Sequence, residues 1–171
     1  AEKGLEIWKN TAPWQRAYTL RKIADLMRER KDVLAKWLTL EEGKPLAEGV
    51  GEVGGGADIF EWNAEETKRI YGQTQQSRFP DTRVHVYYQP VGVVAALVPW
   101  NFPIVLASRK ISTALAAGCS VICKPDTITP GAVMELVSIC KEAGVPDGVV
   151  NLLSGDPAEI YYPSASLGRR A

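Results

Sequence analysis

The sequence predicts an α/β protein in which a layer of helices precedes a partial doubly wound parallel sheet. Two observations support this fold class. Up to about residue 72, apolar side chains recur at the 3.6-residue period of amphipathic helices. After about residue 90, short apolar runs alternate with helical stretches in the order strand–helix–strand–helix–strand, which is the unit of doubly wound sheets. A length of 171 residues with 46% hydrophobic side chains is enough for one domain with its own core.

Three helices are expected in the amino-terminal region. Thr11 is expected to cap the first helix, which has Pro13 in its first turn. The second covers about 31–42. The third covers about 47–71, although the glycines at 54–56 each cost about 1 kcal/mol relative to alanine inside a helix. Charged residues between the apolar positions indicate solvated helix faces. The apolar stripe of the first helix consists of Leu20, Ile23, Ala24 and Met27.

The strands are expected to follow a polar loop at 72–82. Segment 83–90 (RVHVYYQP) alternates and is rich in Val and Tyr, which predicts a strand. The continuous apolar run 91–98 (VGVVAALV) suits a strand that is buried on both faces of a parallel sheet. The remaining expected elements are a helix at 103–117, a strand at 120–124, a helix at 130–143 and a strand at 148–154.

The carboxyl ends of these strands form the expected ligand-binding edge, as in other open α/β sheets. Three polar segments follow the strands, namely PWNFP (99–103), KPDTITP (124–130) and SGDP (154–157). No G-x-G-x-x-G turn follows the first buried strand, and no G-x-x-x-x-G-K-S/T loop of the P-loop ATPases occurs. If this domain binds a dinucleotide, it is therefore expected to do so in a different way.

The composition argues against several classes of function. Twenty basic residues balance twenty acidic ones without a basic run, so nucleic-acid binding is not expected. No apolar stretch reaches the roughly 20 residues of a membrane span, and the charged start lacks a signal-peptide core, so we expect a cytoplasmic protein. With His85 as the only histidine, a metal site is not expected. The cysteines lack disulfide-framework spacing: Cys119, Cys123 and Cys140.

Four segments follow one another in the order and spacing of the NAD(P)-dependent aldehyde dehydrogenases, namely YQPVGVV, PWNFP, AAGCSVICKP and AGVPDGVVNLLSGD. The sequence resembles this family over about residues 1–160. Two further segments, EEGKPLAE and EWNAEETKRIYG, resemble the succinate-semialdehyde dehydrogenase type. The resemblance implies a Rossmann-type domain with a helical layer at 1–72, an oligomerisation arm at 73–90, a cofactor-binding core at 91–160 and an unmatched tail at 161–171.

The resemblance implies a site for NAD or NADP and for an aldehyde at the strand ends. The side-chain amide of Asn101 would contact the aldehyde oxygen, where one such donor typically contributes about 3 kcal/mol to stabilising the developing negative charge. From the residue alone, a turn-forming or helix-capping role of Asn101 before Pro103 is favoured. Contacts to the cofactor are implied for Pro99, Trp100, Asn101, Lys124, Pro125, Asp126, Thr127 and Gly155.

The choice between NAD and NADP is implied by the loop after the second core strand. Lys124 would hydrogen-bond the adenosine ribose, and the alternative is a solvated lysine at a strand end. NAD-preferring relatives often carry a glutamate where this sequence has Thr127, and its carboxylate repels a 2′-phosphate. Thr127 removes that repulsion, although Asp126 can restore part of it. Both cofactors stay open, with NADP slightly favoured.

Arg109 is the residue from which the resemblance implies a class of substrate. In semialdehyde dehydrogenases an arginine at the matching place binds the far carboxylate of the substrate, whereas many other members of the family have an aromatic residue there. A guanidinium binds a carboxylate through two hydrogen bonds, which selects ω-carboxy aldehydes such as succinate semialdehyde. The alternative is an exposed arginine on a helix.

The nucleophilic cysteine and the general-base glutamate of the family belong to later segments that have no counterpart in this sequence. The three cysteines are not expected to replace the nucleophile, because they lack an accessible electropositive setting. We therefore expect an amino-terminal fragment that is inactive alone. The alternatives are a non-catalytic NAD(P)-binding module and a structural remnant. The family forms homo-oligomers (dimers or tetramers), and the arm segment 83–90 is expected to be an exposed edge.

Overall fold

The computed structural model describes residues 1–156, 158 and 160, and the tail predicted at 161–171 lies outside the described residues. In chain order the elements are α1 (Glu2–Lys9), α2 (Pro13–Glu29), α3 (Lys31–Glu42), α4 (Leu46–Glu66), the 3₁₀ turn η1 (Thr67–Arg69), β1 (Gln73–Gln76), β2 (Arg83–Val86), β3 (Val93–Val98), α5 (Pro103–Ala116), β4 (Ser120–Pro125), α6 (Pro130–Glu142) and β5 (Val150–Leu152).

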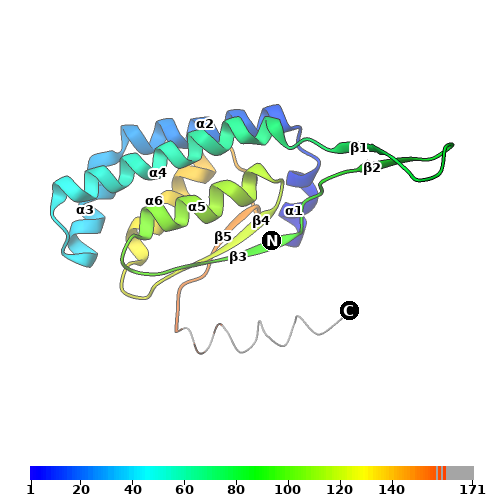
Figure 1. Ribbon diagram of the computed structural model, residues 1–171. Coiled ribbons are helices and arrows are strands. Elements are labelled where there is room, and N and C mark those ends of the chain that lie inside the picture. The colour runs from blue at the N-terminus through cyan, green and yellow to red at the C-terminus, as the bar shows by residue number, and fades with distance from the viewer. Residues whose placement is uncertain (157, 159, 161–171) are drawn as a thin grey trace.

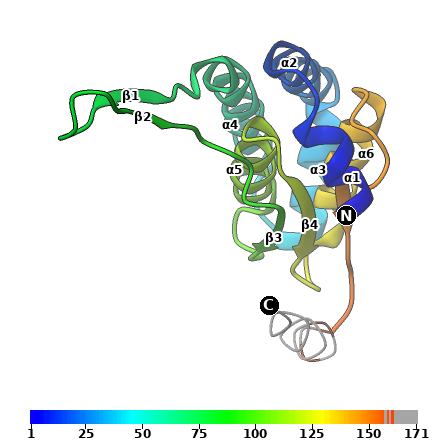
Figure 2. The same ribbon diagram turned by 90° about the vertical axis from the view of Figure 1, so that its right-hand side faces the viewer.

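The parallel sheet has the strand order β3-β4-β5, and α5 and α6 connect its neighbouring strands. Right-handed crossovers that proceed in one direction across a sheet place their helices on the same face. Figure 1 accordingly shows α5 and α6 on one side of the sheet. The helices α2, α3 and α4 form a further layer over them (Figure 1 and Figure 2). The predicted helical layer and partial doubly wound sheet are therefore confirmed.

β3 is an edge strand of the described sheet, so the prediction that it is buried on both faces is wrong. Ala96 and Val98 face the helices and are buried, whereas Val93 and Leu97 are 39% and 40% exposed. The physical reason is that only β4 borders β3, and the described helices cover one face of the sheet. The apolar character of this strand is real, but its second face is open in the described part of the chain.

The helical layer agrees with the predicted boundaries except at its start and its end, where the helix predicted to reach residue 71 stops at Glu66 and is followed by η1. The helix α1 was not anticipated, and the Thr11 hydroxyl donates to the Ile7 carbonyl of α1 (3.0 Å) instead of capping α2. Pro13 lies in the first turn of α2, as predicted. The helix α4 runs through the glycines at 54–56 without a break. Packing against its neighbours therefore outweighs the low helix propensity of these residues.

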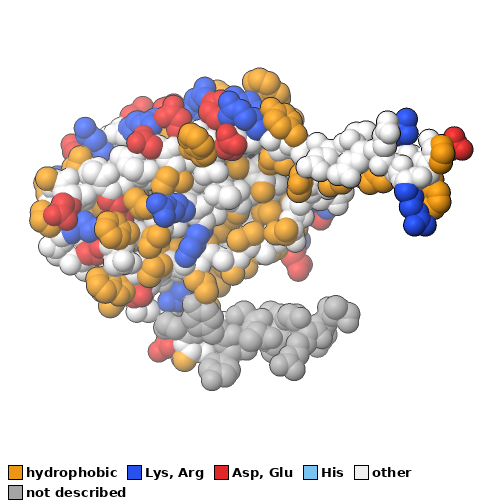
Figure 3. Space-filling view, viewed as in Figure 1, with side chains coloured by type: hydrophobic (Ala, Val, Ile, Leu, Met, Phe, Trp, Pro, Cys, Tyr) orange, Lys and Arg blue, Asp and Glu red, His pale blue; other side chains and the backbone are white. Residues whose placement is uncertain are grey.

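Charged side chains of α2 and α4 pair across the outer surface of the helical layer. Arg28 contacts Asp58 at 2.8 Å and Glu61 at 2.6 Å, and Arg21 pairs with Glu65. Figure 3 shows acidic and basic side chains crowded along the edge of the body where these two helices lie. The predicted solvated faces are confirmed, and exposed pairs of this kind each contribute about 0–1 kcal/mol.

The strands β1 and β2 form an antiparallel hairpin that projects from the body (Figure 1). The polar loop predicted at 72–82 therefore contains a strand, which was missed because its Gln-rich sequence has little strand propensity. The predicted strand 83–90 is shorter than expected, since β2 ends at Val86. Val84 and Tyr87 are 42% and 77% exposed, so this segment is exposed as expected.

Two glycines of α4 offer a matched test of the packing between α4 and α5. At Gly56 an added Cβ would lie 2.9 Å from Ile104 Cγ2 and 2.9 Å from Ser108 Oγ, whereas at Gly54 it would meet nothing within 4 Å. We expect Gly54→Ala to raise the free energy of unfolding by about 1 kcal/mol through helix propensity. In Gly56→Ala, overpacking of about 1–3 kcal/mol should cancel or exceed that gain. Urea unfolding followed by circular dichroism measures both, and equal stabilisation would contradict the close contact.

Candidate functional site

The segments that follow β3, β4 and β5 meet at the carboxyl edge of the sheet, as predicted. Val98, the last residue of β3, lies beside Pro125, the last residue of β4. Leu153, which follows β5, donates its backbone N–H to the Cys123 carbonyl of β4 at 2.9 Å. The strand register therefore brings together the described parts of the three polar segments: 99–103, 124–130 and 154–156.

The turn between β3 and α5 presents Asn101 at the surface. Asn101 is exposed, and its neighbours Trp100 and Phe102 are 54% and 51% exposed. The N-cap residue of α5 is Phe102, and the first N–H groups of the helix are bound by Glu52. The helix-capping interpretation of Asn101 is therefore wrong, and its side-chain amide forms no hydrogen bond within the described residues.

A carboxylate from the helical layer caps α5. Glu52 of α4 accepts hydrogen bonds through Oε1 from the backbone N–H groups of Ile104 (2.9 Å) and Val105 (3.2 Å). Its second oxygen pairs with the Lys44 ammonium, which also lies 3.2 Å from a carboxylate oxygen of Glu42. Sequence reasoning missed Glu52. Its only signal was a glutamate within a stretch of small and apolar residues, without an obvious local partner.

Lys44 is enclosed by these carboxylates and by an aromatic ring. Its side chain is 11% exposed, and Nζ lies 4.5 Å from the centroid of the Phe102 ring, within cation–π range. Burial by itself lowers the pKa of Lys44, but hydrogen bonds to Glu52 and Glu42 outweigh this effect and raise the pKa above its usual value. Lys44 is therefore charged at neutral pH and contacts the turn that carries Asn101.

The glycine spacing of a dinucleotide-binding turn occurs at 49–54 (GVGEVG), but it lies inside α4 and not between a strand and a helix. It therefore lacks the structural context of a phosphate-binding turn. Gly49 instead allows a close approach of α3, since an added Cβ would lie 3.0 Å from the Ala35 carbonyl oxygen. Gly49 thus serves helix packing, whereas an added Cβ at Gly51 or Gly54 would meet nothing within 4 Å.

The loop after β4 holds the second group of predicted cofactor contacts. Lys124 is only 5% exposed, so the alternative of a solvated lysine at a strand end is wrong. Asp126 Oδ1 accepts hydrogen bonds from the Ile128 N–H (3.0 Å) and from the Thr127 hydroxyl (3.4 Å). Thr127 is itself exposed. Asp126 thus shapes the loop, and Thr127 lies open at its surface.

This loop is anchored to the helical layer in the same way as the first. Glu41 of α3 accepts hydrogen bonds from the backbone N–H groups of Gly131 (2.6 Å) and Ala132 (3.2 Å) in the first turn of α6. The N-cap residue of α6, Thr129, supplies no side-chain cap. Unpaired N–H groups and the helix dipole favour negative charge at such an end. The helical layer therefore holds both site loops through the helices that follow them.

Gly155 and Arg109 complete the predicted set. Gly155 lies in the exposed segment after β5 and has a φ of 146°. Arg109 is exposed in the second turn of α5. Its guanidinium forms no hydrogen bond or ion pair with any described residue. The structure thus places the predicted cofactor contacts at the strand ends, while Arg109 stands on the adjoining helix.

None of the three thiols has the setting of a nucleophile. Cys119, Cys123 and Cys140 are all buried and unpaired. Burial raises the pKa of Cys123 and of Cys140 to about 12. Thiols in this state are protonated at neutral pH and unreactive. Among the residues that the structure describes, no group of three or more His, Cys, Asp or Glu side chains could hold a metal ion.

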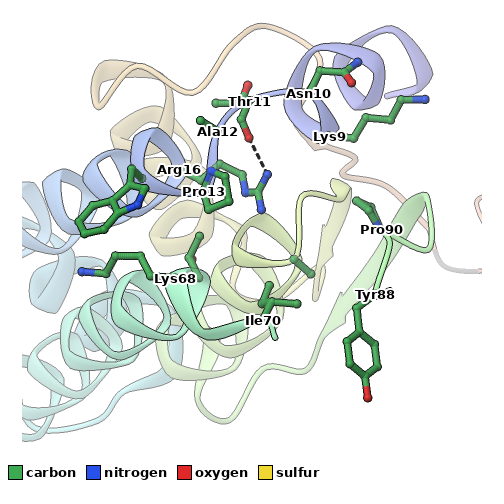
Figure 4. A pocket seen from close by; sticks show the side chains of 13 residues that line it. Lys9, Asn10, Thr11, Ala12, Pro13, Arg16, Lys68, Ile70, Tyr88 and Pro90 are labelled. Carbon is green, nitrogen blue, oxygen red and sulfur yellow. Dashed lines mark hydrogen bonds between the residues drawn. The ribbon is translucent and has the colours of Figure 1, made fainter. Parts of the chain in front are cut away.

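A cavity of about 550 Å³ lies at the opposite end of the sheet, where the chain enters β3 and β4. Figure 4 shows Arg16 in this cavity, donating to the Thr11 carbonyl at 2.6 Å, with Ile70 and Pro90 on its far side. Burial lowers the pKa of Arg16. Within the described part of the chain, no Cys, His, Asp or Glu lines the cavity, and none of the predicted site residues does. The cavity is therefore separate from the candidate site.

Residues 1–163 match the sequence model of the aldehyde dehydrogenase family. The chain belongs to this family. The glutarate-semialdehyde dehydrogenase of Pseudomonas aeruginosa is 44% identical over 160 residues, which are 94% of this chain and 33% of the relative. The NADP⁺ succinate-semialdehyde dehydrogenase GabD of Escherichia coli (strain K12) is also 44% identical over 160 residues, with the same shares of 94% and 33%.

Solved structures of aldehyde dehydrogenases have the same fold. The enzyme from Brucella melitensis biovar abortus 2308 has a TM-score of 0.92 and 43% identity, and the match covers 93% of this chain and 33% of that chain. An NADP-dependent enzyme from E. coli has a TM-score of 0.90 and 45% identity, with 92% and 33% covered. This aldehyde dehydrogenase chain thus spans about a third of the relatives' length. No helix among its described residues is long and apolar enough to cross a membrane.

The buried thiols give a test by chemical labelling. With a pKa of about 12 instead of the ordinary 9.0, the thiolate fraction at pH 8 falls from about one in ten to about one in ten thousand. We expect iodoacetamide to alkylate Cys123 and Cys140 at least about a hundredfold more slowly in the native chain than in the same chain in denaturant. Mass spectrometry of peptides gives the rates, and equal rates in both states would show that the thiols are accessible.

Proposed function

We propose that this aldehyde dehydrogenase chain provides the cofactor half of a site for the NAD(P)-dependent oxidation of an aldehyde to a carboxylic acid. The observation that carries the proposal is the placement of three residues at the carboxyl edge of the sheet: Asn101 and Thr127 on neighbouring loops, and Lys124 near the end of β4. Open α/β sheets bind ligands at this edge. The nicotinamide of the cofactor, when bound, accepts a hydride.

The proposed roles are those that the resemblance to the family implies, and the exposure and hydrogen-bonding capacity of the side chains are compatible with them. The exposed amide of Asn101 donates to the aldehyde oxygen and stabilises the negative charge that develops there. Lys124, nearly enclosed at the end of β4, donates to the adenosine ribose. The remaining cofactor contacts come from Pro99, Trp100, Pro125, Asp126, Thr127 and Gly155.

The proposed substrate is a semialdehyde that carries a carboxylate at its far end. Arg109 supports this, because its exposed guanidinium has no partner among the described residues and can bind a carboxylate through two hydrogen bonds. The names of two relatives, glutarate- and succinate-semialdehyde dehydrogenase, also support it. We infer further that the projecting β1–β2 hairpin is the arm through which copies of the protein associate.

For the cofactor we favour NADP over NAD. Thr127 adds no negative charge at the position where a carboxylate would repel a 2′-phosphate. Asp126 bears the nearest charge within the loop, but its Oδ1 already accepts two hydrogen bonds from the loop itself. Two of the similar proteins carry NADP in their names.

A second candidate function is a module that binds NAD(P) without catalysis. The burial of the three thiols favours this for the chain alone, because the oxidation requires a nucleophile that attacks the aldehyde carbon. The two candidates share the cofactor site and differ only in turnover. Aldehyde-dependent formation of NAD(P)H by the purified chain would establish the first.

We expect the purified chain to bind NADP and NAD, with saturable quenching of tryptophan fluorescence. Trp100 lies in the site, although the chain has five tryptophans that share the signal. Lys124→Ala should abolish the quenching, because it removes the ribose donor, and Asn101→Ala should weaken it. The exposed Lys9 of α1 lines the cavity at the opposite end of the sheet. Lys9→Ala is therefore the matched control and should bind like the wild type.

Circular dichroism of each variant separates lost binding from lost folding. Quenching that persists unchanged in Lys124→Ala would contradict the assignment of the strand-end site. The absence of quenching in the folded wild type at millimolar cofactor would contradict the proposal that this chain binds cofactor by itself.

The preference for NADP is tested at Thr127. Thr127→Glu should weaken NADP relative to NAD by about tenfold, or about 1.4 kcal/mol, because the new carboxylate repels the 2′-phosphate. Thr127→Gln has the same size without the charge and should leave the ratio near that of the wild type. Titrations with NADP and NAD at two salt concentrations measure this ratio of affinities. An effect of charge should become smaller at the higher salt concentration. An unchanged ratio in Thr127→Glu would place the 2′-phosphate elsewhere.

A further inference from the structure

The turn that carries Asn101 is fastened from behind by two buried side chains of the helical layer. Glu52, with a side chain that is 2% exposed, accepts the N–H groups of Ile104 and Val105 at 2.9 and 3.2 Å. Lys44 pairs with the other oxygen of Glu52 and lies over the Phe102 ring. Glu52 therefore holds the first turn of α5, and Lys44 holds the ring of Phe102, the residue that follows Asn101.

The link between these contacts and Asn101 is short and stiff. Only Phe102 and Pro103 separate Asn101 from Ile104, and the proline ring fixes its own φ near −65°. A displacement of the start of α5, or of the Phe102 ring, therefore also displaces Asn101. A donor that must meet a developing charge is sensitive to such shifts, because its effect depends on preorganised geometry.

We propose that Glu52 and Lys44 are positioning residues for Asn101. They fix the first turn of α5 and the Phe102 ring, and through these they set the orientation of the Asn101 amide toward the ligand. Neither side chain contacts the ligand in this arrangement. The inference rests on the proposed role of Asn101 in the cofactor and aldehyde site.

Glu41 provides an internal comparison within the same molecule. It binds the N–H groups of Gly131 and Ala132 at the start of α6, which follows the other site loop. A general loss of stability would disturb both helix starts equally. A positioning role of Glu52 and Lys44 predicts a disturbance at α5 while the start of α6 stays as in the wild type.

The experiment compares four variants of the full chain. Glu52→Gln keeps the shape of the side chain without its charge, Lys44→Met removes the ammonium, and Lys44→Arg restores a cation. Glu48→Gln is the matched control, because Glu48 is an exposed glutamate one helical turn earlier in α4. Three quantities are measured by NMR and fluorescence: hydrogen exchange of the backbone amides, the side-chain amide signals of Asn101, and the Kd for NADP.

In Glu52→Gln and Lys44→Met we expect the Ile104 and Val105 amides to exchange about tenfold faster, while Gly131 and Ala132 exchange as in the wild type. The Asn101 signals should shift or broaden, and the Kd should rise about tenfold. Lys44→Arg should restore all three quantities to within about twofold, because a guanidinium keeps the ion pair and the aromatic contact. Glu48→Gln should match the wild type.

Three results would overturn the inference. The first is an Asn101 signal in Glu52→Gln that coincides with that of Glu48→Gln. The second is faster exchange at Gly131 and Ala132 as well, which indicates a merely structural role. The third is a Kd for NADP that is the same in Glu52→Gln and Lys44→Met as in the wild type, provided that the wild type binds NADP. If the wild type binds no cofactor, the proposed function fails by itself, and the exchange and Asn101 signals still decide the positioning role.

Discussion

Two carboxylates from the helical layer hold the candidate site together. Glu52 binds the start of α5 and Glu41 binds the start of α6, and each accepts two backbone N–H groups that no residue of its own helix can satisfy. The same carboxylate of Glu52 neutralises Lys44, whose side chain is 11% exposed. Lys44 also contacts Glu42 at 3.2 Å, so its charge keeps a partner when Glu52 is replaced.

This arrangement explains why the helical layer and the sheet form one unit. The crossover helices connect the three strands, and their starts follow the loops that carry the predicted site residues. The anchoring contacts from α3 and α4 fix the loops from behind and leave Asn101 and Thr127 exposed. The helical layer thus holds the loops that carry the predicted site residues.

The sequence predicted the elements whose burial shows in a local pattern of residues. The periodic stripe of α2 and the apolar core of β4 are visible in a few neighbouring residues, and the order of elements then implies the strand-end edge. The partners of Glu41 and Glu52 lie 90 and 52 residues away in the sequence, so no local pattern reveals them. The two faces of β3 depend on which elements cover them, which its own residues do not encode.

In the candidate site, too, some features could be predicted from the sequence, and others depend on residues distant in the sequence. The resemblance to the family and the expected sheet edge are together sufficient to single out Asn101, Lys124 and Thr127 as candidates. Whether Asn101 caps α5 depends on which group binds the first N–H groups of that helix, and Glu52 binds them instead. The burial of Lys124 could not be foreseen from the sequence either, because a lysine at the end of a strand is usually solvated.

The long sequence separation of the caps has a consequence for synthesis on the ribosome. Glu41 leaves the exit tunnel well before Gly131, which lies 90 residues later, and at about 5–20 residues per second this delay is roughly 5–20 seconds. Throughout that interval the carboxylate of Glu41 has no helix start to bind, and Trp8 waits still longer for the Leu115 carbonyl, 107 residues on. Closure of the nascent domain is therefore a late event, because the last of these contacts requires Gly131.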